Sequence, residues 1–345
     1  MFLIKKVSKG NIKKLKILGY TLYKKEMGDY YTQETYFKFI KKYKQKYYNK
    51  FFNLKKIFIF NIKIFQSSKL DIRFLLEQYR CENLEGVKKI VSTALLHKHT
   101  FGKYKNIYQN KIVVLVGAGP SINYINKFPT KDIIYVGCNR AFLLKKIKFN
   151  HIFSIDKIGI QDYYKELLNY KGNKCTVFFG DQDAGYNYQI PESYFNKFKN
   201  AEKYKTSRNI LRDGFTLDID SEPIKNNVNV ALQAIQFIFF TNPKKIYLVG
   251  IDCNTFTAGH FTGIERDTSF RKDEVQSNND IKAISQWYKC KEFRDTYYPE
   301  TEIISVNPIG LKGIFKDKYT QNYLNENPKI QKELGNKAEI LWEIN

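Results

Sequence analysis

A glycine-rich turn near the middle of the chain has the composition of a phosphate-binding loop. The stretch KIVVLVGAGPSI, residues 111–122, runs from β-branched residues into Gly117, Ala118, Gly119, Pro120 and Ser121. Glycines at such a turn let the backbone approach a phosphate, and we expect a helix to follow. The NAD and FAD fingerprint also needs a third glycine, where this chain has Ile122, and an acidic residue about twenty positions later, which is missing. We therefore predict a loop for a different nucleotide; a tight turn without a ligand is the alternative.

Polar residues come directly after four other apolar segments. They are Asn139 after YVGC, Asp156 after HIFSI, Asp181 and Asp183 after VFFG, and Asp252 after YLVGI. Asn139 offers a neutral amide where a ribose or a base edge would lie. The Asp181-Gln182-Asp183 triplet has the form with which many sugar-nucleotide transferases hold a divalent ion, but such triplets are frequent by chance. We predict no metal site and no required cofactor, and leave a need for Mg²⁺ open.

One histidine stands where a general base would be useful. His260 lies in the loop sequence TAGHF, which follows the segment that ends at Asp252. Imidazole titrates near neutral pH, so His260 is our first candidate for the catalytic base, with Asp252 and Asp156 as the other candidates. His151 precedes its apolar segment and is predicted to be structural. His97 and His99 lie two positions apart in a polar helix terminus and form a poor metal pair.

The chain is strongly basic. Its 345 residues contain 58 Lys and Arg against 34 Asp and Glu, which gives a net charge of +24. Such a charge favours an anionic partner: nucleic acid, a lipid surface or a phosphorylated substrate. The alternative is a composition set by an AT-biased genome, which the spread of charge along the chain favours.

The cysteines and the apolar runs indicate the compartment. Five cysteines without a CxxC pair fit a reduced, cytoplasmic protein and argue against a structural zinc site. No apolar run reaches 18 residues, so we expect a soluble or peripheral protein. The start of the chain has no signal-peptide pattern.

Residues 1–68 are predicted to be a basic region with an internal repeat. NIKKLKILGYTLYKKE (11–26) aligns without gaps with NLKKIFIFNIKIFQSS (53–68), and each copy has the pattern of a β-hairpin around Gly19 or Asn61. The Tyr- and Lys-rich stretch between them, residues 30–52, is predicted to be helical. This mixture favours an anionic membrane surface slightly over a satellite domain with solvated lysines, and nucleic acid ranks last.

The rest of the chain is predicted to be an α/β domain. Residues 69–105 have the pattern of a helical connector, and residues 326–345 that of a C-terminal helix or tail. Between them, residues 106–325 alternate apolar strands with helices. This alternation predicts a Rossmann-like, mostly parallel sheet with helices on both faces, and ligands in such sheets bind beyond the carboxyl ends of the strands.

Several segments in order resemble a known family. VVLVGAGPSI, VGCNRAF, the helix-and-strand segment ending in IYLVGID, GHF and ISVNPIGLKGIF resemble the DUF115 family, which includes archaeal 6-hydroxymethylpterin pyrophosphokinase-like proteins and bacterial flagellin-modifying factors. The same pattern is similar to the bacterial lipooligosaccharide sialyltransferases of glycosyltransferase family 42. The resemblance covers about residues 108–320 and implies a single, GT-A-like nucleotide-binding domain.

The resemblance implies a site and an activity. It places Gly117, Gly119, Pro120, Ser121 and Asn139 around the nucleotide of a CMP-linked sugar, with Asp156 near the polar position after the third strand. This chain has Ala118 between the two glycines, where the sialyltransferases usually have Asn, and lacks their histidine before the helix DIKAI; His260 matches the DUF115 pattern instead.

The implied function is transfer of a sialic-acid-like nonulosonic acid from a CMP-activated donor to a bacterial surface glycan, a lipooligosaccharide, a capsule or flagellin. The expected partners are the donor, a glycan or lipid-linked acceptor and an anionic membrane; nucleic acid is not expected, and an oligomer is possible. The expected location is the cytoplasm or the inner face of the inner membrane. The alternatives are an ATP-dependent pyrophosphokinase, with Mg²⁺ held by aspartates, and a non-catalytic scaffold at the membrane.

Overall fold

The computed structural model describes residues 4–335 apart from 10–11, 18–19, 28–30, 37–39, 49–51, 60–61, 71–83, 156, 171–173, 183–194, 208–213, 226–228 and 254–273. Three residues of the predicted site, Asp156, Asp183 and His260, lie outside the described residues. The chain divides into two compact units, Met1–Ser92 and Thr93–Asn345, and each is treated by itself below.

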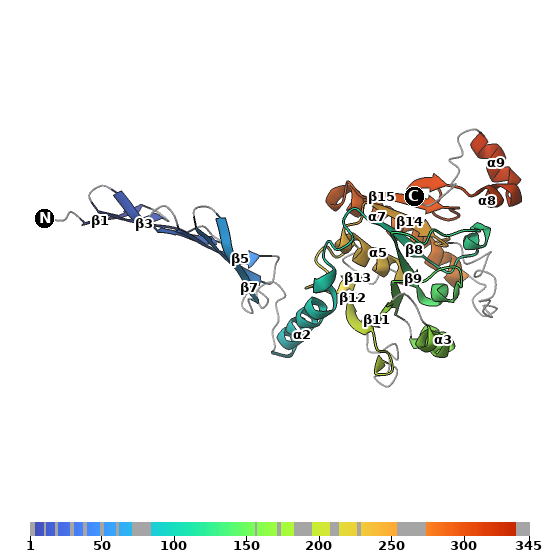
Figure 1. Ribbon diagram of the computed structural model, residues 1–345, viewed down its shortest axis with the longest axis horizontal. Coiled ribbons are helices and arrows are strands. Elements are labelled where there is room, and N and C mark those ends of the chain that lie inside the picture. The colour runs from blue at the N-terminus through green and yellow to red at the C-terminus, as the bar shows by residue number, and fades with distance from the viewer. Residues whose placement is uncertain are drawn as a thin grey trace. The chain divides into compact units, whose positions relative to one another are not determined.

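The larger unit is built on a parallel sheet of nine strands (Figure 1). Their spatial order is β13-β12-β11-β10-β9-β8-β14-β15-β16, and every neighbouring pair is parallel. The strands are β8 (Ile112–Val116), β9 (Ile133–Cys138), β10 (His151–Ser154), β11 (Thr176–Gln182), β12 (Ala201–Ser207), β13 (Ile224–Lys225), β14 (Lys245–Val249), β15 (Glu302–Val306) and β16 (Lys316–Lys318). The predicted α/β fold with a parallel sheet is confirmed.

Side chains alternate between the two faces of the central strands, and both faces are buried. Val113 and Leu115 of β8 belong to one core cluster, whereas Val114 and Val116 belong to the other. Burial on both faces explains the uninterrupted apolar sequences of these strands.

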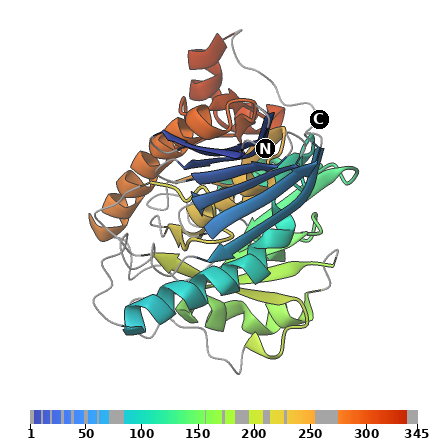
Figure 2. The ribbon, with the colours of Figure 1, turned by 90° about the vertical axis from the view of Figure 1, so that its left-hand side faces the viewer.

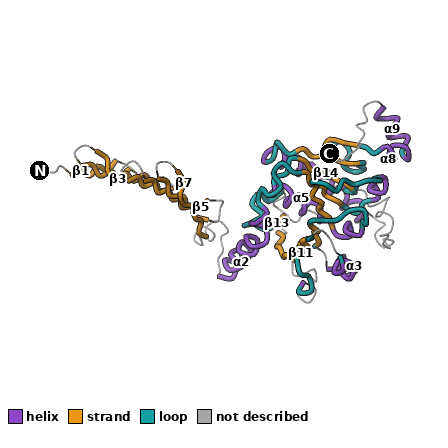
Figure 3. Tube along the Cα trace, viewed as in Figure 1, coloured by secondary structure: helices purple, strands orange, loops and turns teal. Residues whose placement is uncertain are grey.

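Different helices cover the two faces. The first cluster contains residues of α2 (Leu84–Phe101), α5 (Val230–Thr241) and α7 (Glu274–Tyr297), and the second contains residues of α3 (Lys157–Asn169) and of two short 3₁₀ helices, η2 (Pro120–Tyr124) and η3 (Asn139–Leu143). Figure 3 separates these helices from the strands by colour. The Asn229 side chain caps α5 by accepting a hydrogen bond from the Leu232 amide (3.1 Å). The remaining helices are η1 (Gly102–Tyr104), α8 (Gln321–Glu326) and α9 (Pro328–Leu334).

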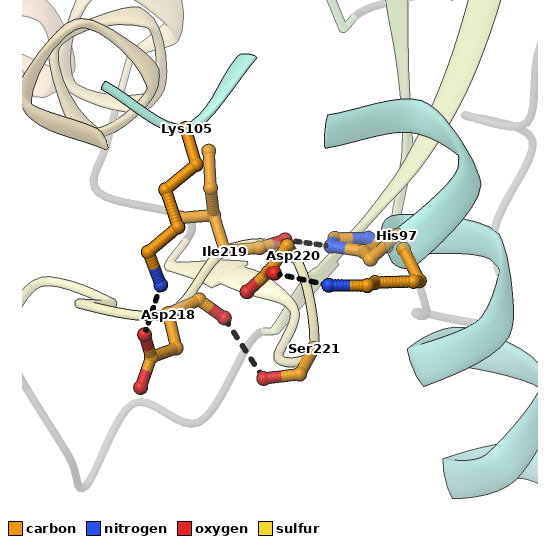
Figure 4. A network of polar contacts seen from close by, with 7 residues as sticks. His97, Lys105, Asp218, Ile219, Asp220 and Ser221 are labelled. Atoms are coloured by element: carbon orange, nitrogen blue, oxygen red, sulfur yellow. Dashed lines mark hydrogen bonds and ion pairs between the residues drawn. The ribbon is translucent and has the colours of Figure 1, made fainter. Parts of the chain in front are cut away.

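Helix α2 is held to the sheet unit by a buried histidine (Figure 4). His97 Nε2 accepts a hydrogen bond from the Lys205 amide, so its Nδ1–H donates to the Ile219 carbonyl, both at 2.8 Å. Lys98 pairs with Asp220 at 3.0 Å beside it. His97 is fully buried, and burial lowers its pKa to about 4. His97 therefore lies in the interior rather than in the polar terminus that the sequence predicts.

The smaller unit contains one antiparallel sheet of seven strands in chain order. They are β1 (Ile4–Lys9), β2 (Ile12–Ile17), β3 (Tyr20–Met27), β4 (Tyr31–Tyr36), β5 (Ile40–Tyr48), β6 (Phe52–Ile59) and β7 (Ile62–Leu70). Figure 2 shows these strands side by side. Both predicted hairpins are present, as β2–β3 and β6–β7, and their pairing shifts at equivalent points of the repeat, after Leu15 and after Ile57.

The predicted helix between the hairpins is wrong, because residues 31–36 and 40–48 form strands β4 and β5. Aromatic and β-branched residues favour strands, and tyrosine and threonine make up four of the six residues of β4. No described helix is long and apolar enough to cross a membrane.

Candidate functional site

The glycine turn lies at the point where the strand order reverses. The chain passes from β8 outward through β9 to β13, and then returns to place β14 on the other side of β8. In open α/β sheets, ligands bind at the carboxyl ends of the strands next to such a reversal. The loops after β8, β9 and β14 therefore carry the residues to consider: Gly117–Ser121, Asn139 and Asp252.

Gly117 and Gly119 are required by close packing against the loop after β14. A Cβ atom on Gly117 would lie 2.3 Å from the Gly250 carbonyl oxygen, and one on Gly119 would lie 2.4 Å from Cγ of Asp252. Neither distance leaves room for a side chain. Both glycines are thus explained by contacts within the protein.

Asp252 joins the two loops through both of its carboxylate oxygens. Oδ2 accepts a hydrogen bond from the Ser121 amide at 2.9 Å, and Oδ1 accepts one from Ser121 Oγ at 2.5 Å. Both residues are buried. Burial raises the pKa of Asp252, and the two hydrogen bonds from Ser121 act in the opposite direction. The predicted base candidate Asp252 is therefore fully engaged with the predicted nucleotide-binding residue Ser121.

The amides of the turn are largely used inside the protein. The Gly117 amide donates to the Val249 carbonyl (2.8 Å), and the Gly119 amide donates to the Gly250 carbonyl (2.9 Å). The Ser121 amide donates to Asp252, and Pro120 has no N–H. The sequence predicts that the backbone of this turn approaches a phosphate. Within the described part of the chain, the Ala118 amide is the one amide of the turn that is left to bind it. The expected helix after the turn is also only the five-residue η2, so it adds little dipole.

Asn139 is the best-placed polar group for a ligand. It follows β9, the strand next to β8, and has a left-handed backbone (φ +48°), which asparagine tolerates. Its Oδ1 accepts hydrogen bonds from Ser154 Oγ and Tyr163 Oη, both at 3.3 Å, and these two hydroxyls lie 2.6 Å apart. One of these hydroxyls donates to the other, which leaves one hydroxyl proton for Oδ1. With Oδ1 as the acceptor, Nδ2 is oriented as a donor, and Asn139 is itself half-buried rather than enclosed.

The loop after β15 completes the support of the turn, and the sequence analysis did not identify it. The fully buried Asn307 also has a left-handed backbone (φ +48°), and its Oδ1 accepts from the Thr320 amide at 2.8 Å. Its Nδ2 donates to Thr320 Oγ1 (3.0 Å) and to the Ser121 carbonyl (3.5 Å). The Gly310 amide donates to the Asp252 carbonyl at 2.8 Å. The Asn-Pro pair after an apolar strand was the available signal, because it marks a turn.

The remaining acidic candidate is paired. Lys205 forms an ion pair with Asp181 across the neighbouring strands β11 and β12. Among the described residues there is no group of three or more histidine, cysteine, aspartate or glutamate side chains placed to hold a metal ion.

No protein-family model and no curated protein matches the chain. Solved structures to which it is similar include the MAf glycosyltransferase from Magnetospirillum magneticum AMB-1, with a TM-score of 0.41 and 12% identity over 67% of this chain and 38% of that one. The chain thus spans less than two fifths of the Magnetospirillum protein.

Two further similar structures come from Campylobacter jejuni. Sialyltransferase CstII, in complex with cytidine-5'-monophosphate, has a TM-score of 0.35 and 18% identity over 57% of this chain and 80% of that one. The monofunctional α-2,3-sialyltransferase Cst-I has a TM-score of 0.37 and 15% identity over 57% and 75%. At these scores and identities the likeness concerns the fold, and no activity follows from it.

Proposed function

We propose that the chain is a glycosyltransferase that takes a sialic-acid-like nonulosonic acid from a CMP-linked donor and transfers it to a bacterial surface glycan. The observation that carries the proposal is the Asn139 amide, fixed by Ser154 and Tyr163 beside a tethered turn at the reversal of strand order. A rigid donor at that place suits a ribose hydroxyl, a base edge or a phosphate oxygen. The motif order GAGPS then CN, which resembles the family 42 sialyltransferases, supports cytidine.

In this mechanism the turn positions the donor, while other residues carry out the chemistry. The acceptor hydroxyl attacks the anomeric carbon, the bond from that carbon to the phosphate oxygen breaks, and CMP leaves. The Ala118 amide and the Asn139 Nδ2 group stabilise the departing nucleotide. We assign proton removal from the acceptor to His260 rather than to Asp252, because both oxygens of Asp252 accept hydrogen bonds from Ser121.

The proposal is tested by the thermal shift that each nucleotide produces. We expect CMP to raise the melting temperature of the full chain, in EDTA as well as in Mg²⁺, and UDP, GDP and ATP to raise it less. Release of CMP from CMP-sialic acid in the presence of a glycan acceptor then measures transfer. His260→Ala should abolish transfer while the CMP shift persists. Stabilisation by ATP with Mg²⁺ alone would replace this proposal with pyrophosphoryl transfer, and no stabilisation by any nucleotide would contradict both activities.

A further inference from the structure

The positive charge of the chain is concentrated in its N-terminal sheet. Residues 1–70 contain 18 lysines, no arginine and only three acidic residues, Glu26, Asp29 and Glu34. Their net charge of +15 is most of the +24 of the whole chain, although they are about a fifth of its length. The charge is therefore not spread along the chain, which removes the argument for a purely compositional origin.

The strand register collects apolar residues into one row. Cross-strand partners lie on the same face of an antiparallel sheet. The partners run Lys6, Leu15, Tyr23, Tyr36, Ile40, Ile59, Ile62 across all seven strands. Six of these seven residues are aliphatic or aromatic. We call this set the apolar row.

A row that contains three lysines lies next to the apolar row on the same face. The partners two positions further along the strands are Ser8, Lys13, Lys25, Glu34, Lys42 and Ile57; the last partner, Phe65, is three positions from Ile62, because the pairing of β6 and β7 shifts there. The opposite face has its own continuous row of partners, Val7, Lys14, Lys24, Thr35, Lys41, Phe58, Lys63, in which lysine is the commonest residue. The first face thus combines the apolar row with three lysines, Lys13, Lys25 and Lys42, and one glutamate, Glu34.

We propose that this face is a docking surface for an anionic phospholipid membrane. Transfer of tyrosine and isoleucine side chains from water to the depth of the lipid headgroups is favourable, and lysines beside them are attracted to lipid phosphates. Lysines on the opposite face lie farther from the same surface, and salt screens their attraction over a Debye length of roughly 8 Å at physiological ionic strength. This inference goes beyond the proposed transferase activity and does not depend on it.

Charge and side-chain chemistry favour lipid over the other occupants. A second copy of the chain on this face would oppose another sheet of charge +15, which disfavours self-association. Single-stranded nucleic acid would match the lysines, but the aliphatic half of the apolar row, Ile40, Ile59 and Ile62, has no ring on which a base can stack. An anionic membrane would interact favourably with both rows on this face.

The test is co-sedimentation of the full chain with vesicles. We expect binding to vesicles of phosphatidylcholine with 30% phosphatidylglycerol, little binding to phosphatidylcholine alone, and weaker binding as salt is raised. Lys13→Glu/Lys25→Glu/Lys42→Glu should weaken binding by on the order of a hundredfold. The matched control is Lys14→Glu/Lys24→Glu/Lys41→Glu, which changes the charge of the same sheet equally on the other face and should weaken binding clearly less.

Four results would overturn the proposed face or the proposed lipid surface. Equal or greater loss in the control variant would overturn the assignment of the face. Failure of the unmodified chain to bind anionic vesicles, or tighter binding to a 20-nucleotide single strand than to those vesicles, would overturn the lipid surface itself, and neither of these two results depends on how a variant folds. Dimerisation of the chain that blocks vesicle binding would also overturn the lipid surface, and would indicate that a second copy of the chain occupies this face. Because no nucleotide is added, none of these results bears on the proposed transferase activity.

Discussion

The hydrogen bonds of Asp252 decide whether this residue acts as a general base or holds the turn in position. A carboxylate after the fifth apolar segment is a reasonable general base when only the sequence is known. In the structure both of its oxygens accept hydrogen bonds from Ser121, and its carbonyl accepts one from the Gly310 amide. This arrangement fixes the loops after β8, β14 and β15 to one another. We therefore regard Asp252 as a positioning residue for the turn.

Asp252→Asn separates the two roles. The amide group of asparagine would face the two Ser121 donors with a donor of its own, so we expect a loss of about 2 kcal/mol in unfolding free energy. CMP affinity should fall about tenfold, while transfer at saturating donor should stay within about threefold of the unmodified rate and keep its pH profile. If Asp252 were the base, transfer would instead fall by a factor of about 10² or more with CMP affinity unchanged.

Gly119 should tolerate no side chain. Gly119→Ala places a Cβ 2.4 Å from Cγ of Asp252 and 2.8 Å from the Gly250 carbonyl, so the turn must move. We expect a loss of about 2 kcal/mol or more, read from urea unfolding, together with weaker CMP binding. Gly102→Ala is the control, because its Cβ would meet only the flexible side chain of Lys98 at 3.4 Å or more. Equal stability of the two variants would contradict the packing of the turn against β14.

At the scale of elements, the sequence predicted the strands that have uninterrupted apolar runs and missed strands whose sequences are polar. Six strands of the parallel sheet and helix α5 follow from apolar runs of the right length. Strand β12 was missed because its sequence AEKYKTS is polar, and only Tyr204 and Thr206 are buried. Strands β4 and β5 lie in the Tyr- and Lys-rich stretch that was predicted to be helical, because their sequences, YTQETY and IKKYKQKYY, do not alternate strictly between apolar and polar residues.

The place of the site was predictable in part, because it follows from the predicted parallel sheet. Strand ends at one edge of a parallel sheet bring Gly117, Asn139 and Asp252 to that edge from widely separated positions in the chain. The partners of these residues follow from side-chain geometry, which the sequence does not give: Ser154 and Tyr163 at Asn139, and Ser121 at Asp252. The internal use of the turn amides could not have been foreseen either.

Two buried histidines should make the larger unit sensitive to acid. Burial lowers the pKa of His97 to about 4 and that of His151, which hydrogen-bonds Tyr108, to about 3. In the unfolded chain both histidines titrate near pH 6.5. Below that pH the unfolded state therefore binds protons, while the two histidines of the folded state stay neutral. The free energy of unfolding is thus unaffected above pH 6.5 and falls as the pH drops toward 4, by about 2 kcal/mol per histidine at pH 5.

Urea unfolding at pH 7 and pH 5 measures this loss. His97→Gln should be less stable at pH 7, since Lys205 and Ile219 lose their shared partner, but should show about half of the pH dependence. The control is His99→Gln, a substitution of the same type at an exposed position of the same helix. The same pH dependence in His97→Gln and in the unmodified chain would show that His97 is not the source.

At the scale of the whole molecule, the chain combines two units of different composition. The N-terminal sheet carries most of the net charge, whereas the candidate donor site lies entirely within the larger unit. Under our two proposals, the N-terminal sheet binds the membrane and the larger unit binds the nucleotide.

The two units should respond to substitutions independently. Lys13→Glu/Lys25→Glu/Lys42→Glu should change vesicle binding without changing CMP affinity by more than about twofold, because these lysines and Asn139 belong to different compact units. Asn139→Ala should do the reverse. Coupled losses in both assays, measured on the same preparations, would contradict the division.

The central claim is that a cytidine nucleotide binds beside Asn139 at the carboxyl end of β9. The most direct measurement is a calorimetric titration of CMP into the unmodified chain and into Asn139→Ala. We predict a single site in the unmodified chain and an affinity about tenfold lower in the variant, which loses one oriented hydrogen-bond donor. Undetectable CMP binding, or the same affinity in both proteins, would contradict the claim.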